Sequence, residues 1–198
     1  MISAIILAAG ESRRMGQPKM LLPWGNASVL GHVLSTFQKA GVDDVIVVTG
    51  GAHEQVQEIV KQNGGRSIFN REFENGEMLS SVQCGLQVLS EEGAGASAAL
   101  IGLGDQPQVQ METVVLICET FRAGRSRIIV PSFQMRRGHP WLLEKSLWDE
   151  LLQLRPPQSP RDFLDKHADE IIYVEVNTPS ILADLDTPDD YQSSRPKP

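Results

Sequence analysis

Over its first two-thirds the chain alternates short strand-like segments with longer segments of helical period, and this alternation limits its fold more than any other feature. The strand-like segments lie at residues 3–7, 45–48, 66–69, 98–103 and 127–130. The helix-like segments, in which apolar side chains recur every three or four positions, lie at residues 29–40, 54–62, 78–89 and 111–121. Continuously apolar strands need cover on both faces, and the alternating helices supply it. The pattern therefore predicts an α/β fold: a single domain in which helices flank both faces of a mostly parallel, twisted sheet.

The last third of the sequence is less regular. Pro156, Pro157 and Pro160 interrupt it, and residues 171–176 form one more strand-like run. A chain of 198 residues suits one well-buried core better than two. We therefore assign residues 1–192 to one domain and expect residues 193–198 to form a disordered tail.

Composition and charge exclude several classes of protein. The formal net charge of -7 argues against a nucleic-acid partner, because nucleic-acid binders usually carry a basic face. Cys84 and Cys118 lie in different predicted helices and form neither a disulfide framework nor a C-x-x-C motif. No apolar stretch approaches the ~20 residues of a membrane span, and the N-terminal apolar run lacks the features of a secretory signal. We therefore expect a cytoplasmic protein with no nucleic-acid and no membrane partner.

Glycine and polar residues follow three of the predicted strands at their ends. A basic loop follows Leu7, Thr49 and Gly50 close the second strand, and Gly104 and Asp105 close a later one. Ligands of parallel α/β sheets bind beyond the carboxyl ends of the strands. The three segments therefore predict a ligand site at one edge of the sheet.

The loop after the first strand, residues 7–19, holds three cations and one acid. Gly10 and Gly16 permit positive φ and a close approach of the backbone to a ligand, and successive backbone N–H groups can form an anion nest. An arginine and a lysine add charge-assisted hydrogen bonds to phosphate oxygens. The spacing fits neither the Walker phosphate loop nor the dinucleotide-binding fingerprint. By itself, the pattern leaves open both a phosphate-binding loop and a surface loop with solvated charges.

This loop and three later blocks resemble one protein family. The pattern L-A-A-G-x-S-x-R-M-G-x-x-K-x-L-L at residues 7–22 is similar to the signature of nucleotidyltransferases with the glycosyltransferase-A type fold, and most of all to the molybdenum cofactor cytidylyltransferase branch. The later blocks are G-D-Q-P at 104–107, R-G-H-P at 137–140 and D-L-D-T-P-D-D at 184–190. They follow in order along almost the whole chain. The resemblance implies this fold and Mg²⁺-dependent transfer of CMP from CTP to molybdopterin, with release of pyrophosphate.

Such a transfer needs cations more than it needs a base. The acceptor phosphate is already an anion above its second pKa of ~6, so the protein must bring two anions together and stabilise the leaving pyrophosphate. We assign Arg14 to the triphosphate, and Lys19 to the α-phosphate and its transition state, as catalytic residues. The resemblance implies nucleotide binding by Leu7, Ala8, Ala9, Gly10, Arg14, Lys19, Ser80, Ser81 and Asp105.

The polar stretch that contains Asn70, Gly76, Ser80 and Ser81 leads into a predicted helix. Hydroxyls at a helix N-terminus can hold a base edge or a ribose, and they can equally cap the helix. The residues alone leave both roles open, whereas the resemblance implies base and ribose contacts here.

Two carboxylates are candidate metal ligands. Asp105 and Asp186, together with phosphate oxygens and water, suit Mg²⁺, which prefers hard oxygen ligands. Each also fits a helix cap, Asp105 before the helix at 111–121 and Asp186, or Thr187, at the start of a last helix. The resemblance implies that Asp105 and Asp186 bind the metal and that Asp184 supports them.

The block at residues 136–140 places two arginines and a histidine in one turn. Such a turn can clamp the phosphate of an acceptor, and the resemblance implies acceptor binding by Arg137 and His139.

Alternatives remain within and outside this branch. The guanylyltransferase branch reads L-A-G-G where this chain has Ala9, whose methyl group should crowd a purine and favour a pyrimidine. Other relatives transfer nucleotides to other small-molecule phosphates. A non-catalytic carrier of molybdopterin nucleotide could lose the metal carboxylates, which this chain retains. The expected partners are CTP and the molybdopterin cofactor, together with a molybdoenzyme or its chaperone.

Overall fold

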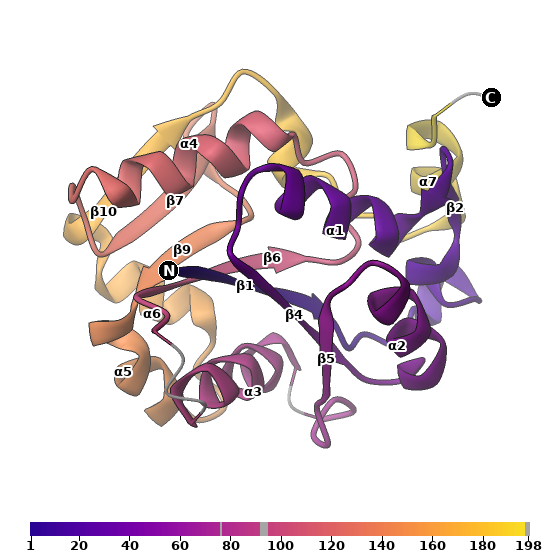
Figure 1. Ribbon diagram of the computed structural model, residues 1–198, viewed down its shortest axis with the longest axis horizontal. Helices are drawn as coiled ribbons and strands as arrows, with labels where there is room; N and C mark the ends of the chain where they lie inside the picture. Colours follow the sequence, from indigo (N-terminus) through magenta and orange to yellow (C-terminus); the bar gives the residue numbers. More distant parts are fainter. Residues whose placement is uncertain (76, 92–94, 197–198) are drawn as a thin grey trace.

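The computed structural model describes residues 1–75, 77–91 and 95–196, and within these residues one eight-stranded sheet crosses the molecule (Figure 1). Its strands follow the order β10, β7, β9, β6, β1, β4, β5, and β8 pairs with β7. Their bounds are β1 Ile2–Ala8, β4 Asp44–Thr49, β5 Arg66–Phe69, β6 Ala98–Leu103, β7 Ile128–Phe133, β8 Arg136–Arg137, β9 Trp141–Glu144 and β10 Ile171–Glu175. Both neighbours of β1 are parallel to it, whereas β9 runs antiparallel to β6 and β7. The predicted α/β fold with a mostly parallel sheet is confirmed.

Helices cover both faces of this sheet (Figure 1). One face carries α1 Val29–Lys39, α2 His53–Gln62 and α4 Met111–Arg122, and the other carries α3 Glu77–Glu91, α5 Trp148–Gln153 and α6 Pro160–Lys166. Alternate side chains of β1 serve the two cores, because successive residues of a strand point to opposite faces. Ile6 packs in the first core and Ile5 in the second, and both are fully buried. Gly85 lets α3 lie close to β1, since a Cβ there would be 2.5 Å from Cγ2 of Ile5.

A third, smaller core joins the two ends of the chain. It contains Met15, Leu22, Trp24, Val29, Leu185 and Tyr191. The ribbon formed by β2 (Pro23–Trp24) and β3 (Ala27–Ser28) lies here against α7 (Pro188–Ser194), as Figure 1 shows. The hydroxyl of Tyr191 donates a hydrogen bond of 2.7 Å to the carbonyl oxygen of Pro23. The C-terminal helix is therefore fixed to the segment that follows the basic loop.

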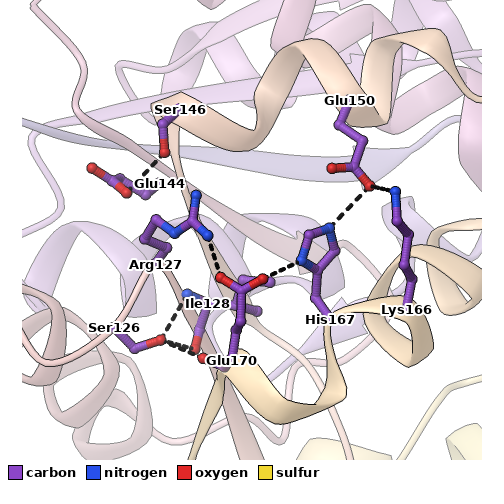
Figure 2. A network of polar contacts seen from close by, with 9 residues as sticks. All are labelled: Ser126, Arg127, Ile128, Glu144, Ser146, Glu150, Lys166, His167 and Glu170. Carbon is purple, nitrogen blue, oxygen red and sulfur yellow. Dashed lines mark hydrogen bonds and ion pairs between the residues drawn. The ribbon is translucent and has the colours of Figure 1, made fainter.

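Charged side chains tie the second half of the chain together (Figure 2). His167, directly after α6, is buried, and each ring nitrogen meets a carboxylate: Nδ1 lies 2.7 Å from Glu170 Oε1 and Nε2 lies 2.9 Å from Glu150 Oε1. Glu150 belongs to α5, and Glu170 ends the short 3₁₀ helix η4 (Ala168–Glu170). Arg127, just before β7, forms an ion pair with Glu170. One network thus joins α5, α6 and the start of β7.

The structure differs from the sequence prediction mainly in the last third. The strand β9, the ribbon and the helices α5 and α6 were not predicted, because they are too short to show a clear period. The helix α7 begins where the sequence offered a last helix, with Thr187 as its N-cap. Ser193 and Ser194 are helical residues of α7, so ordered structure extends into the predicted tail. Gly76 and residues 197–198 lie outside the described residues. In the part of the chain that the structure describes, no helix is long and apolar enough to cross a membrane.

Candidate active site

The basic loop leaves β1 at the carboxyl edge of the sheet and forms two short 3₁₀ helices, η1 (Arg13–Met15) and η2 (Lys19–Leu21). The left-handed conformation occurs at Ser12, with a φ of 54°, and at Gly16, with a φ of 70°. It does not occur at Gly10, one of the two glycines that the sequence offered for it. The Ser12 hydroxyl accepts a hydrogen bond of 3.1 Å from the backbone N–H of Lys19. This bond closes the loop and helps to offset the strain at a non-glycine residue.

The basic loop also contacts the end of β4, which pairs with β1 in the sheet. A Cβ at Gly50, directly after β4, would lie 2.2 Å from the carbonyl oxygen of Ala9, so only glycine fits there. The two loops therefore touch through their backbones. This contact brings the ends of β1 and β4 together at the edge of the sheet where the sequence predicts a ligand site.

Four of the predicted site residues meet in one ionic cluster. The ammonium of Lys19 contacts Asp105 Oδ2 and lies 3.3 Å from Asp186 Oδ1. The guanidinium of Arg14 lies 2.8 Å from Asp186 Oδ2. The side chain of Lys19 is 11% exposed and that of Arg14 is 70% exposed, so the lysine is fixed within the cluster and the arginine extends into solvent. Arg13, to which the sequence analysis gave no role, pairs with Glu11 instead.

Burial and charge act in opposite directions on Lys19. Desolvation lowers its pKa, but the charges and hydrogen bonds of Asp105 and Asp186 outweigh this effect and raise the pKa above the ordinary value of 10.5. Lys19 is therefore a permanent cation at neutral pH. It is shared between two carboxylates that lie 81 positions apart in the sequence.

A third carboxylate, Asp184, stands beside this cluster. Desolvation raises its pKa, and the charges of Asp105 and Asp186 add to the effect. Gln106 Nε2 donates a hydrogen bond of 2.6 Å to Asp184 Oδ1, and the backbone N–H of Leu185 donates one of 3.2 Å to the carbonyl oxygen of Asp105. Sequence reasoning did not single out Gln106, although its place directly after Asp105 could have indicated it.

The capping question at the last helix has a clear answer. Thr187 is the N-cap of α7: its hydroxyl accepts from the backbone N–H of Asp190, and the Asp190 carboxylate accepts from the backbone N–H of Thr187. Asp186 takes no part in this capping box. Its carboxylate instead pairs with Lys19 and Arg14.

A cavity of about 370 Å³ opens beside the cluster. Its walls are Leu7, Ala9, Gly10, Lys19, Met20, Phe73, Glu77, Met78, Ser81, Leu103, Asp105, Asp184 and Asp186. Seven predicted nucleotide or metal residues are thus brought together. Phe73, Glu77 and Met78 were missed, because only the position of α3 against β1 brings them here.

Three predicted nucleotide residues do not line this cavity. Arg14 is linked to its wall through the ion pair with Asp186. Ser80 lines a different hollow from Ser81, although Asn70 Nδ2 donates to both hydroxyls, at 2.8 and 3.1 Å. Ala8 is the buried last residue of β1 and lines a smaller hollow next to the cavity.

A second cavity, of about 740 Å³, adjoins the first, and Met78 lines both. Arg137 and His139, the predicted acceptor residues, are in its wall, with Arg136, Trp141, Arg161 and Asp165. Desolvation lowers the pKa of His139 to about 4, so this histidine is neutral at physiological pH and adds no positive charge. Arg161 and Asp165 come from α6 and were not predicted, because no local motif marks them.

The cluster can be tested as a site for a divalent cation. Within the described residues, no group of three or more His, Cys, Asp or Glu side chains is arranged to hold a metal ion. Asp105 and Asp186 nevertheless converge on a single cation position, which the Lys19 ammonium takes in this structure. Two carboxylates suffice for Mg²⁺ when phosphate oxygens and water complete its shell. The residues therefore fit a metal that arrives with its nucleotide.

Comparison with known proteins finds relatives that match almost the whole chain. The molybdenum cofactor cytidylyltransferase of Escherichia coli strain K12 is 27% identical over 198 residues, which cover 98% of this chain and 95% of the relative. The structure of Rv0371c from Mycobacterium tuberculosis matches with a TM-score of 0.82 at 28% identity, covering 97% of this chain and 96% of the other. A complex of Rv0371c with manganese matches with a TM-score of 0.75 at 27% identity and the same coverage, 97% and 96%.

A nucleotidyl transferase from a Methanothermobacter species matches with a TM-score of 0.81 at 25% identity, covering 98% of this chain and 96% of the other. The model of the MobA-like NTP transferase domain matches residues 4–171, most of the chain. This chain belongs to the family of the MobA-like NTP transferase domain and is a nucleotidyltransferase.

Proposed function

We propose that this chain transfers CMP from CTP to the molybdopterin form of the molybdenum cofactor and releases pyrophosphate. The observation that carries the proposal is the position of the ionic cluster of Arg14, Lys19, Asp105 and Asp186 beside two adjoining cavities. The smaller cavity has the size for part of a nucleotide and combines apolar wall residues with charged groups of the cluster, and the larger one suits a bulky acceptor. The similarity to a molybdenum cofactor cytidylyltransferase supports the choice of substrates.

The proposed reaction is a substitution at phosphorus. A phosphate oxygen of the acceptor forms a bond to the α-phosphorus of CTP, and the bond from that phosphorus to the β-phosphate oxygen breaks, so that pyrophosphate leaves. The acceptor oxygen is already ionised above pH ~6, and no residue has to remove a proton from it. The protein supplies position and positive charge. Lys19 would serve the α-phosphate, and Arg14 has the exposure to reach the triphosphate.

Asp105 and Asp186 would hold Mg²⁺ together with phosphate oxygens of the nucleotide. Bound there, the ion would offset the negative charge of the triphosphate and of the leaving pyrophosphate. The positive charge of Lys19 would then be free to interact with phosphate rather than with the two carboxylates. The manganese complex of Rv0371c supports a divalent cation in a related protein.

The nucleotide would lie against Leu7, Ala9, Gly10 and Ser81, with Ala8 and Ser80 behind this wall. Ala9 is 7% exposed and its backbone is fixed against Gly50. Its methyl group would narrow the base site for a pyrimidine. The alternative is a guanylyltransferase, which would catalyse the same type of nucleotide transfer with GTP.

Ala9→Gly tests the choice of base. Removal of the methyl group should raise kcat/KM for GTP relative to that for CTP, because more space is left for a purine. Steady-state kinetics with both nucleotides give the ratio. An unchanged ratio would show that another residue selects the base, with Ser81 next to examine.

Arg137 and His139 would bind the acceptor. The neutral imidazole of His139 would act through a hydrogen bond, and the charge would come from arginine. A molybdoenzyme or its chaperone would receive the product, and the reaction would take place in the cytoplasm.

The decisive experiment offers the protein molybdopterin cofactor, Mg²⁺ and each of CTP, GTP, ATP and UTP, and measures release of pyrophosphate. Turnover with CTP alone is the expected result. A preference for GTP would favour the guanylyltransferase alternative. Tight binding of molybdopterin cytidine dinucleotide without any turnover would identify a carrier.

A further inference from the structure

The guanidinium of Arg137 is held from two sides by residues of other elements. Its Nε donates a hydrogen bond of 2.7 Å to the hydroxyl of Tyr173, and the Tyr173 ring lies under the guanidinium at 5.6 Å from the ring centroid. Its Nη1 donates to Asp165 Oδ1. Arg137 belongs to β8, Tyr173 to β10 and Asp165 to α6, so three distant segments converge on one side chain.

The contacts leave part of the guanidinium free for a ligand. Arginine has five N–H donors in a rigid plane, and Tyr173 and Asp165 engage only two of them. Arg137 lines the larger cavity, whereas Tyr173 is not among the residues that line it. A ligand in the cavity can therefore meet Arg137 but not Tyr173. Any effect of Tyr173 on that ligand must act through Arg137.

The charges of the cavity wall fit a dianion. Arg136, Arg137 and Arg161 contribute three positive charges and Asp165 one negative charge, while His139 is neutral. Arg161 is 88% exposed and lies 3.9 Å from Asp165, too far for a strong ion pair. The balance of about two positive charges matches a phosphate monoester, which carries between −1.5 and −2 at pH 7.

The helix that carries Asp165 is itself fixed at both ends. A capping box of Ser159 and Asp162 begins α6. At its other end, His167 lies between Glu150 and Glu170 (Figure 2). A long arginine side chain loses conformational freedom when it binds an anion, and a support that already fixes it removes part of that cost. The rigid α6 and the sheet strand β10 provide such a support.

We propose that Tyr173 and Asp165 are positioning residues that hold the guanidinium of Arg137 in the orientation that binds the phosphate of the acceptor. The inference rests on the proposed function, which assigns the larger cavity to the acceptor. It adds two residues that no motif contains and that need not touch the substrate.

Tyr173→Phe is the main test, because it removes one hydrogen bond and keeps the ring and the charge. The KM for the acceptor should rise roughly two- to tenfold, the usual effect of one hydrogen bond, while kcat and the KM for CTP stay unchanged. In an Arg137→Gln background the same substitution should have no further effect on that KM, because its target is gone. Additive effects of the two substitutions would overturn the proposal.

Asp165→Asn distinguishes position from charge. If Asp165 holds Arg137, its loss should raise the KM for the acceptor even though the cavity becomes more positive. A lower KM would overturn its assignment. Asp44→Asn is the matched control: it removes a carboxylate bonded to Arg66 at the amino end of β4, far from the cavity, and should leave the KM unchanged.

Failure of the proposed function would be visible separately, as wild-type protein without turnover on molybdopterin. The inference is then tested by measuring how tightly inorganic phosphate binds in the presence of saturating CTP. The readout is tryptophan fluorescence, to which Trp141 in the cavity wall contributes. The inference is supported if Tyr173→Phe binds phosphate more weakly than the wild type, and if the same substitution has no further effect in the Arg137→Gln background. Equal binding by the wild type and Tyr173→Phe overturns it.

Discussion

At the scale of single residues, Lys19 has two electrostatic roles that exclude each other. In the free protein its ammonium is the shared partner of Asp105 and Asp186. In the proposed complex the same ammonium faces the α-phosphate, and a divalent cation takes its place between the carboxylates. Each carboxylate has a cationic partner in both states, so neither state leaves one of them unpaired.

Lys19→Ala should lower kcat by on the order of 10²-fold or more and change the KM for CTP much less, because the lost charge matters most in the transition state. Steady-state kinetics measure both constants. Arg13→Ala is the matched control, since Arg13 is in the same loop but pairs with Glu11, and it should behave like the wild type. Near-normal turnover of the Lys19 variant would remove this residue from the catalytic group.

Asp186→Asn should abolish most of the turnover and most of the extra thermal stability that Mg²⁺ and CTP together confer. The structure supplies the contrasting variant, because Asp190 rather than Asp186 completes the capping box of α7. Asp190→Ala should lower the melting temperature equally with and without metal and nucleotide. Differential scanning fluorimetry separates the two patterns. A full response of the Asp186 variant to Mg²⁺ and CTP would exclude it as a ligand.

At the scale of elements, α5 and α6 bury Trp148, Leu151 and Phe163 in the second core, and a polar network joins the two helices to β7. Burial of His167 lowers its pKa, but hydrogen bonds from its ring to Glu170 and Glu150, and the charges of both, outweigh this and raise the pKa above 6.5. Lys166 pairs with Glu150 and Arg127 with Glu170, so the network alternates in charge.

The pH dependence of stability follows from this shift. A raised pKa in the folded state means that His167 stabilises the fold fully below about pH 6.5 and loses this contribution as pH rises through the folded pKa. The melting temperature gap between the wild type and His167→Gln should therefore shrink as pH rises above about 6.5, through the raised pKa of His167. His32→Gln is a control with the opposite slope, because burial and then Lys39 lower the pKa of His32. A constant gap for His167 would contradict the interpretation.

At the scale of the whole molecule, the third core is what brings the two ends of the chain to one site. Leu185 is fully buried in it, between Asp184 and the half-buried Asp186, and Met15 is buried beside it. The backbone bond from Leu185 to Asp105 connects this core to the end of β6. Packing of a few apolar side chains thus fixes the positions of the charged ones.

Leu185→Ala should lower the free energy of unfolding by about 2–5 kcal/mol, as expected for a cavity at a buried leucine. It should also lower kcat of the folded protein, because Asp105 and Asp186 lose their alignment. Leu89→Ala is the matched control: Leu89 is equally buried, near the end of α3 that is far from the site. Urea unfolding and kinetics on both variants should show similar destabilisation and a loss of kcat for Leu185→Ala alone.

The sequence by itself determined the α/β layers and most of the residues at the site. Hydrophobic period is a local property, so the strands of the first two-thirds and their helices could be read from it, and a buried strand end places its loop at the ligand edge. The roles of the basic loop and of Asp105 and Asp186 were predicted from the resemblance to a family, whose motifs are also local in the sequence. The antiparallel β9 was not, since pairing partners are chosen by tertiary packing.

Only the tertiary structure decided which side chains meet. The residues alone left open whether Asp186 caps the last helix or joins the site, and the structure shows that it pairs with Lys19 while Thr187 and Asp190 cap α7. Nothing local indicates that Ser80 and Ser81 face different hollows, or that Tyr173 and Asp165 reach Arg137. These contacts depend on how separate elements pack across the sheet. Their energies come from long-range burial and charge, which a local pattern of residues does not record.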